Sequence, residues 1–120
     1  MSDPTEAEIA GEAEEPAESE LPAEIVRLEA VVHGRVQGVG FRVFVADFAN
    51  GCGLAGWVRN EADATVRCVA EGPRDRLEAL AARLRDGPWG ARVDSVQLTW
   101  SSPSGEQGSF RVRAGSHPGD

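Results

Sequence analysis

The chain has 120 residues and a formal net charge of −8, and nine of its 20 acidic residues lie within residues 1–24, which contain no Lys or Arg. The remaining acidic residues nearly balance the 12 basic ones, all of them Arg, so the rest of the chain offers no strong electrostatic case for binding nucleic acid or a membrane surface. No apolar run approaches the roughly 20 residues that span a bilayer, and about 96 residues can bury one modest core without cross-links.

Residues 1–24 combine their acidic side chains with Ala, Pro, Ser and Gly, and they predict a disordered acidic tail. Their apolar surface is too small to repay the entropy of ordering. We interpret the tail as a solubilising extension, with partner binding as the alternative. It lacks the basic start and apolar run of a secretion signal, so we expect a cytoplasmic protein. Cys52 and Cys68 have no spacing typical of a zinc site or a disulfide framework, and both are expected to be reduced.

The folded part begins with a strand, a glycine-rich loop and a helix. Residues 25–33 are rich in Val and Ile, which is typical of a strand. Apolar residues then recur at i, i+3, i+4 and i+7, the pattern of one buried helix face. They are Phe41, Phe44, Val45 and Phe48. Residues 50–53, Asn-Gly-Cys-Gly, predict the end of this helix, because Asn and Gly tolerate the left-handed conformation found at helix ends.

Two strands, a second helix and two further strands follow. Residues 54–60 and 65–71 predict strands joined by a tight hairpin. Pro73 opens the helix in a first turn where its missing N–H costs nothing, and Gly87-Pro88 ends it. The apolar face of this helix comprises Leu77, Leu80, Ala81 and Leu84. The last predicted elements are a strand at 93–100, a polar loop at 101–107 and a short strand at 109–114, after which residues 116–120 are expected to fray.

This order, βαββαβ with a short extra C-terminal strand, predicts an α+β fold of the ferredoxin-like split βαβ type over residues 25–115. In that fold an antiparallel sheet carries two helices on one face. Its first and second strands run parallel with the third between them, so their carboxyl ends lie at the same edge. We therefore expect the loop after the first strand to lie near Asn60, at an edge that favours ligand binding. The aromatic residues expected in the core are Phe41, Phe44, Phe48 and Trp57.

Residues 34–42, Gly-Arg-Val-Gln-Gly-Val-Gly-Phe-Arg, form the most informative motif. Glycines let the backbone fold tightly with its amides facing one point, a shape that binds anions. The positive end of the following helix and the guanidinium of Arg42 add to the same point. The motif lacks the Gly-Lys-Ser/Thr of Walker A and the third glycine of the dinucleotide pattern. It predicts a binding site for a phosphate-like group, with a tight strand-to-helix turn that binds no ligand as the alternative.

Two stretches of the chain resemble the two signatures of the acylphosphatase family. The first is residues 32–42, and the second is residues 56–60, Gly-Trp-Val-Arg-Asn, followed by Val66 and Gly72. The resemblance covers residues 27–114 and implies hydrolysis of acyl phosphates without a metal, a cofactor or a covalent intermediate. It also implies that Arg42 holds the phosphoryl group and that Asn60 holds and orients the attacking water. Backbone amides would complete the phosphate site, from Arg35, Val36, Gln37, Gly38, Val39, Gly40 and Phe41.

The chemistry of an acyl phosphate agrees with this implication. Transfer of a phosphoryl group to water needs charge stabilisation and in-line positioning more than covalent help. The leaving carboxylate has a pKa of about 4 to 5 and departs without being protonated, so the site needs no general acid. This matches a loop with no evident catalytic His, Cys or carboxylate cluster beside it. The acceptor of the water's proton stays open, with an oxygen of the substrate phosphate as one candidate.

Ala64 departs from the second signature, which has glycine at that position. If the position needs a left-handed backbone, Ala costs on the order of 1 kcal/mol. Asp63 tolerates that conformation better and is the alternative residue to adopt it. The departure bears on the geometry of the hairpin and on the aim of Asn60, and it leaves the proposed phosphate ligands untouched.

We expect a monomer that acts on a small-molecule acyl phosphate and binds neither nucleic acid nor membrane. The first alternative is a non-catalytic phosphate- or anion-binding module on the same ferredoxin-like fold, and another is such a domain at the amino end of a maturation factor. An RNA-binding domain is disfavoured, because the chain has no Tyr and its strands lack the Lys/Arg-Gly-Phe cluster that stacks bases.

Overall fold

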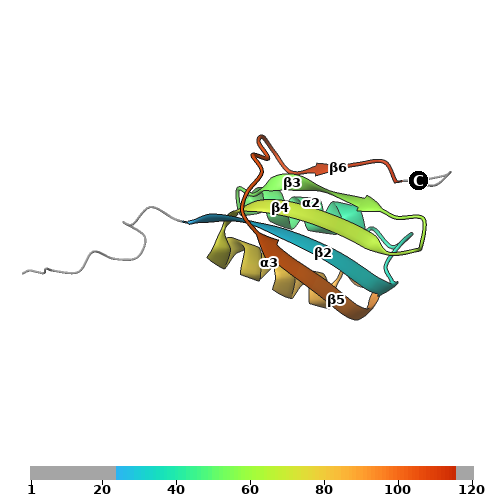
Figure 1. Ribbon diagram of the computed structural model, residues 1–120. Helices are drawn as coiled ribbons and strands as arrows, with labels where there is room; N and C mark the ends of the chain where they lie inside the picture. The colour runs from blue at the N-terminus through green and yellow to red at the C-terminus, as the bar shows by residue number, and fades with distance from the viewer. Residues whose placement is uncertain (1–23, 116–120) are drawn as a thin grey trace, which may run out of the picture.

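The structure, a computed structural model, describes residues 24–115 and places two helices on one face of a five-stranded sheet (Figure 1). Residues 1–23 of the predicted acidic tail (1–24) and the predicted frayed end, residues 116–120, fall outside these residues. The elements in chain order are β2 (Ile25–Arg35), α2 (Phe41–Gly51), β3 (Ala55–Asn60), β4 (Val66–Pro73), α3 (Arg74–Asp86), β5 (Arg92–Ser101) and β6 (Arg111–Val112). Each lies where the sequence predicts an element of its kind. Neither helix is long and apolar enough to cross a membrane.

The strand order is β5-β2-β4-β3-β6. β2 pairs antiparallel with β4 and β5, and β3 pairs antiparallel with β4, so β2 and β3 run parallel with β4 between them, as predicted. β6 instead pairs parallel with β3, which makes the whole sheet mixed rather than antiparallel. The cause is the path of the chain after β5, which crosses to the far edge of the sheet near the end where β3 begins (Figure 1). From there β6 can only run in the direction of β3.

The core lies between the sheet and the two helices, as the apolar periodicity predicts. Helix α2 contributes Phe41 and Val45, and helix α3 contributes Leu77, Leu80 and Leu84, each at most 2% exposed. They pack against one face of the central strands, whose buried residues are Leu28, Ala30, Val32, Val58, Val66, Cys68 and Ala70. Phe44 and Phe48 are partly buried at the margin of this cluster. The free thiol of Cys68 is enclosed here, and burial raises its pKa to about 12.

Trp57 is buried as predicted, but on the opposite face of the sheet. It is not part of the cluster beneath the helices, and the guanidinium carbons of Arg59 and Arg113 lie 5.0 and 4.6 Å from its ring centroid. Alternation along β3 explains the difference, because Val58 points toward the helices and its neighbour must point away. The tryptophan therefore makes cation–π contacts with two arginine side chains on this face.

Charged side chains form a network on this helix-free face. Arg27 Nη1 donates to Glu71 at 2.8 Å, and Arg67 Nη2 donates to Glu29 at 2.9 Å. The Glu71 carboxylate, only 3% exposed, also accepts backbone N–H bonds from Ser104 at 2.8 Å and from Gly105 and Glu106 at 3.0 Å. Burial alone would raise the pKa of Glu71, but the hydrogen bonds from Ser104, Arg27 and Glu106 outweigh it and lower the pKa to about 2.

Candidate active site

A glycine loop, residues 36–40, connects the end of β2 to the start of α2. Gly38 and Gly40 have φ of 75° and 77°, in the left-handed region, and a Cβ at either would meet nothing within 4 Å. These two glycines are therefore required by backbone conformation and not by lack of space. Gly34, just before the loop, is required by space as well, because a Cβ there would lie 2.1 Å from the carbonyl oxygen of Arg92.

Helix α2 begins directly at the end of the glycine loop. Gly40 is its N-cap residue and provides no side-chain cap. The first amides of an α-helix have no partner within the helix, and they carry the positive end of its dipole. The first turn of α2 has no acidic residue, so no carboxylate within that turn neutralises the positive end of the helix dipole. The local geometry is that of an anion site at a helix N-terminus.

A hollow of about 120 Å³ lies against the glycine loop and brings Arg42 and Asn60 together. Its lining residues are Val36, Gly38, Gly40, Phe41, Arg42, Val43, Asn60 and Val112. Asn60, 6% exposed, reaches it from the end of β3, where it pairs with Val66, the residue that also pairs with Val32 near the end of β2. The expected proximity of the loop and Asn60 is therefore confirmed. Arg35, Gln37 and Val39 belong to the predicted set but do not line the hollow.

The C-terminal strand also contributes to this hollow, which the sequence does not indicate. Val112 of β6 is in its lining, and Arg42 Nη1 donates to the carbonyl oxygen of Arg113 at 3.3 Å. The amide of Arg113 in turn donates to the carbonyl oxygen of Val58 at 2.9 Å, so the end of β6 is fixed to β3. Val43 and Val112 are 58% and 44% exposed, and they give the hollow an apolar rim.

The tight turn after Asn60 contains the departure noted at Ala64. Ala64 has φ of 76° and is the one non-glycine residue with positive φ among residues 24–115. The alternative that Asp63 adopts this conformation is wrong. The Asp63 carboxylate accepts from the hydroxyl of Thr65 at 2.6 Å and from its amide at 3.1 Å, which lowers the pKa of Asp63, and its φ is not positive. Ala64 is left to make the left-handed turn.

Two predicted neighbours of the site use their side chains elsewhere. Gln37 Nε2 donates to the carbonyl oxygens of Glu61 and Thr65, both at 2.9 Å, and so contacts the turn after Asn60. Arg59, next to Asn60 in β3, donates to the Glu61 carboxylate at 2.6 Å on the helix-free face. The Gln37 side chain is therefore directed at this turn and not at the hollow.

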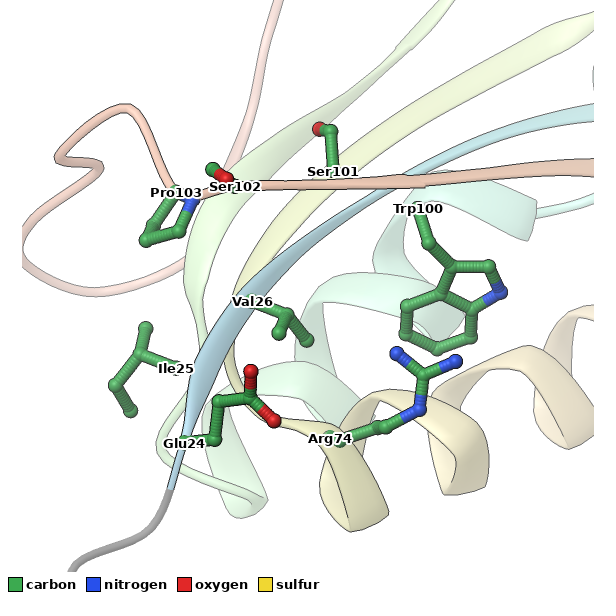
Figure 2. Close-up of a pocket in the computed structure, with 8 residues that line it drawn as sticks. All are labelled: Glu24, Ile25, Val26, Arg74, Trp100, Ser101, Ser102 and Pro103. Atoms are coloured by element: carbon green, nitrogen blue, oxygen red, sulfur yellow. The ribbon is translucent and has the colours of Figure 1, made fainter.

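A larger but open hollow, about 420 Å³, lies at the opposite end of the sheet, where β2 begins (Figure 2). Figure 2 shows the Arg74 guanidinium against the Trp100 ring, and its carbon lies 4.2 Å from the ring centroid. The Arg74 side chain also forms an ion pair with Glu78 at 3.5 Å. Its lining includes no residue of the glycine loop and no amide side chain. The smaller hollow is therefore the candidate active site.

Within residues 24–115, no group of three or more His, Cys, Asp and Glu side chains is placed to hold a metal ion. The donors at the candidate site are instead a guanidinium, a carboxamide and backbone amides.

Comparison with known proteins matches most of the described residues. The family model "Acylphosphatase" matches residues 28–112. An acylphosphatase of Salinibacter ruber is 48% identical over 87 residues, which cover 72% of this chain and 92% of that protein. One of an Anaeromyxobacter species is 46% identical over 91 residues, covering 76% and 98%. The crystal structure of acylphosphatase from Bacillus subtilis is similar with a TM-score of 0.71 at 37% identity, covering 73% of this chain and 98% of that one.

Proposed function

The chain belongs to the acylphosphatase family, and we propose that it splits acyl phosphates into a carboxylate and inorganic phosphate by direct attack of water on phosphorus. A bond forms between the water oxygen and phosphorus, and the bond between phosphorus and the carboxyl oxygen breaks. The single observation that supports this mechanism best is the hollow shared by Arg42, Asn60 and the glycine loop.

The phosphoryl group binds at the glycine loop. The guanidinium of Arg42 and the backbone amides from Arg35 to Phe41 neutralise the charge that spreads over its oxygens in the transition state. Left-handed Gly38 and Gly40 support this role, because they turn the loop tightly in front of the α2 N-terminus. These donors are fixed before substrate arrives, so little reorganisation accompanies the reaction.

Asn60 holds the attacking water. Its carboxamide can accept a hydrogen bond from the water through oxygen and donate through nitrogen, which orients a neutral nucleophile without deprotonating it. Its burial at the end of β3 supports the role, because a buried side chain holds one orientation more closely than an exposed one. The acyl group leaves as a carboxylate past the rim of Val43 and Val112 and needs no proton from the enzyme.

Replacement of Arg42 or Asn60 tests these roles in hydrolysis of benzoyl phosphate with a chelator present. Arg42→Ala is expected to lower kcat/KM about 10³-fold or more, as for other cationic donors in phosphoryl transfer. Asn60→Ala is expected to lower kcat about 10²- to 10³-fold. Arg92→Ala is the matched control, because the exposed side chain of that arginine pairs with Asp94 and its removal should leave activity unchanged.

Activity that survives both substitutions would remove these residues from the mechanism. A wild-type protein that binds phosphate without hydrolysing benzoyl phosphate would instead favour the non-catalytic binding module. Hydrolysis in H₂¹⁸O checks the direct attack, since the label must appear in phosphate. Label in benzoate would mean attack at the carbonyl carbon.

An oxygen of the substrate phosphate accepts the proton of the attacking water in this scheme, because no carboxylate, His or Cys side chain lines the hollow. We therefore expect kcat to be nearly constant between about pH 5 and pH 8. Measurement of kcat across that range checks the assignment. A single steep ionisation near neutrality that belongs to the enzyme would contradict it.

The monomeric state, the cytoplasmic location and the lack of affinity for nucleic acid and membranes stay predictions. Sedimentation equilibrium would test the first.

A further inference from the structure

The Gln37 side chain connects the two halves of the candidate site. Its backbone belongs to the glycine loop, while its Nε2 donates to the carbonyl oxygens of Glu61 and Thr65, both at 2.9 Å. A primary amide nitrogen has two N–H donors, so both are used on this one turn. Glu61 directly follows Asn60, which places the contact one residue from the proposed water-binding side chain.

The carbonyls that Gln37 binds are the same ones that close the turn. Glu61 oxygen also accepts from the amide of Ala64 at 3.1 Å, and Thr65 oxygen accepts from the amide of Glu61 at 2.8 Å. The turn holds Ala64 in a left-handed conformation that is unfavourable for a residue with a Cβ, so hydrogen bonds are needed to keep this geometry. Gln37 supplies two of them from outside the hairpin.

We propose that the Gln37 side chain is a positioning residue that sets the aim of Asn60 relative to the glycine loop. The inference rests on the proposed function. One residue then acts on both halves of the site, through its backbone at the phosphate and through its side chain at the turn that continues from Asn60. Displacement of a reacting group by about 1 Å can cost roughly 10²-fold in rate. Loss of both hydrogen bonds is therefore expected to lower kcat by about 10- to 100-fold.

Two variants of similar side-chain length test the inference. Gln37→Glu places a carboxylate against the two carbonyl oxygens at neutral pH, and Gln37→Met removes the donors without adding charge. In both, kcat for benzoyl phosphate should fall about 10- to 100-fold, whereas the inhibition constant of inorganic phosphate should change less than about threefold, because Arg42 and the loop amides are retained. Gln107→Glu is the matched control, since this exposed glutamine makes the same charge change on the β5–β6 loop and should leave kcat unchanged.

The pH profile separates positioning of Asn60 from a loss of packing. Protonation of the new carboxyl in Gln37→Glu restores one O–H donor to the turn. The kcat of this variant, relative to wild type, should therefore rise as the pH falls through the pKa of that carboxyl. Gln37→Met has no group that can regain a proton, so its deficit should not depend on pH.

Three results would overturn the inference. They are an unchanged kcat in both variants, a phosphate inhibition constant that rises as much as kcat falls, and loss of folding in both variants by circular dichroism. The second result would mean that Gln37 contributes to phosphate binding. The third would mean that Gln37 stabilises the fold. Failure of the proposed function looks different, because then wild type does not hydrolyse benzoyl phosphate or Asn60→Ala keeps full activity.

Discussion

Ala64 shows how one residue bears on the site without touching it. Its φ of 76° is the conformation that only glycine adopts freely, and it closes the turn that follows Asn60. The turn keeps this shape because Asp63 binds Thr65 and because Gln37 binds two of its carbonyls. The chain thus carries a local strain next to a proposed catalytic residue and offsets it with hydrogen bonds.

Ala64→Gly is expected to stabilise the protein. The substitution relieves about 1–2 kcal/mol of strain in the folded state. The greater conformational freedom of Gly stabilises the unfolded chain by about 0.5–1 kcal/mol, so the free energy of unfolding should rise by a net amount of roughly 0.5–1 kcal/mol. Urea unfolding measures the change. Ala62→Gly in the same turn is the control, because its φ is not positive and it gains no relief, so that variant should be less stable than wild type. A less stable Ala64→Gly would show that the strain is absent.

Strand β6 shows how a two-residue element completes a site built mostly elsewhere. Its pairing with β3 places the Arg113 carbonyl oxygen against Arg42 and Val112 in the lining of the hollow. The side chain of Arg113 covers Trp57 on the helix-free face. The last strand therefore links the proposed phosphate-binding arginine to the sheet edge, although its own composition carries no catalytic signal.

Val112→Ser is expected to weaken hydrolysis of benzoyl phosphate more than of acetyl phosphate. A benzoyl ring that buries about 40 Å² against this rim gains about 1 kcal/mol, which corresponds to a roughly fivefold change in kcat/KM. Acetyl phosphate has little apolar area and should change less than about twofold. Kinetics with both substrates check this. Ile25→Ser removes an equally exposed apolar side chain at the other end of the sheet and should affect neither. Equal losses for both substrates would contradict contact with the acyl group.

At the scale of the whole molecule, the two faces of the sheet are covered in different ways. One face carries both helices over an apolar core, and the other carries the network of Arg27, Glu29, Arg67 and Glu71. Glu71 connects that face to residues 104–106, which lead the chain across to β6. The folded position of the strand that completes the site therefore depends on a buried carboxylate far from Arg42.

Acid should destabilise the protein through Glu71. Its pKa is about 2 in the folded state against an ordinary value of 4.5, so its contribution is complete above about pH 4.5 and is lost as the pH falls toward 2. That difference corresponds to a contribution on the order of 3 kcal/mol. Glu71→Gln should lower the free energy of unfolding at pH 7 by about 2–4 kcal/mol and reduce its dependence on pH between 4.5 and 2.

Urea unfolding at several pH values measures both effects. Glu78→Gln is the control, because that carboxylate is 61% exposed in an i,i+4 pair and should contribute less than about 0.5 kcal/mol. An undiminished pH slope in Glu71→Gln would assign acid sensitivity to other carboxylates.

The sequence by itself determined the elements, the split βαβ order and the candidate residues Arg42 and Asn60. The elements follow from local signals, because apolar periodicity and glycine placement act through the few residues on either side. The two candidate residues stand out through the resemblance to the two acylphosphatase signatures. They also follow from topology, since parallel β2 and β3 must bring the glycine loop and Asn60 to one edge. Their roles in catalysis stay predictions.

Only the tertiary structure decided the face of Trp57, the direction of β6 and the partners of Gln37 and Glu71. The sequence alone allows Trp57 to lie on either face of the sheet. In the structure the register of β3 places Val58 on the helix-covered face, so Trp57 lies on the opposite face. The hydrogen bonds of Gln37 and Glu71 join residues 24 to 44 positions apart, which no local sequence pattern indicates. Contacts of this kind form only once the sheet brings distant segments side by side, so the link from Gln37 to the turn after Asn60 is seen only in the tertiary structure.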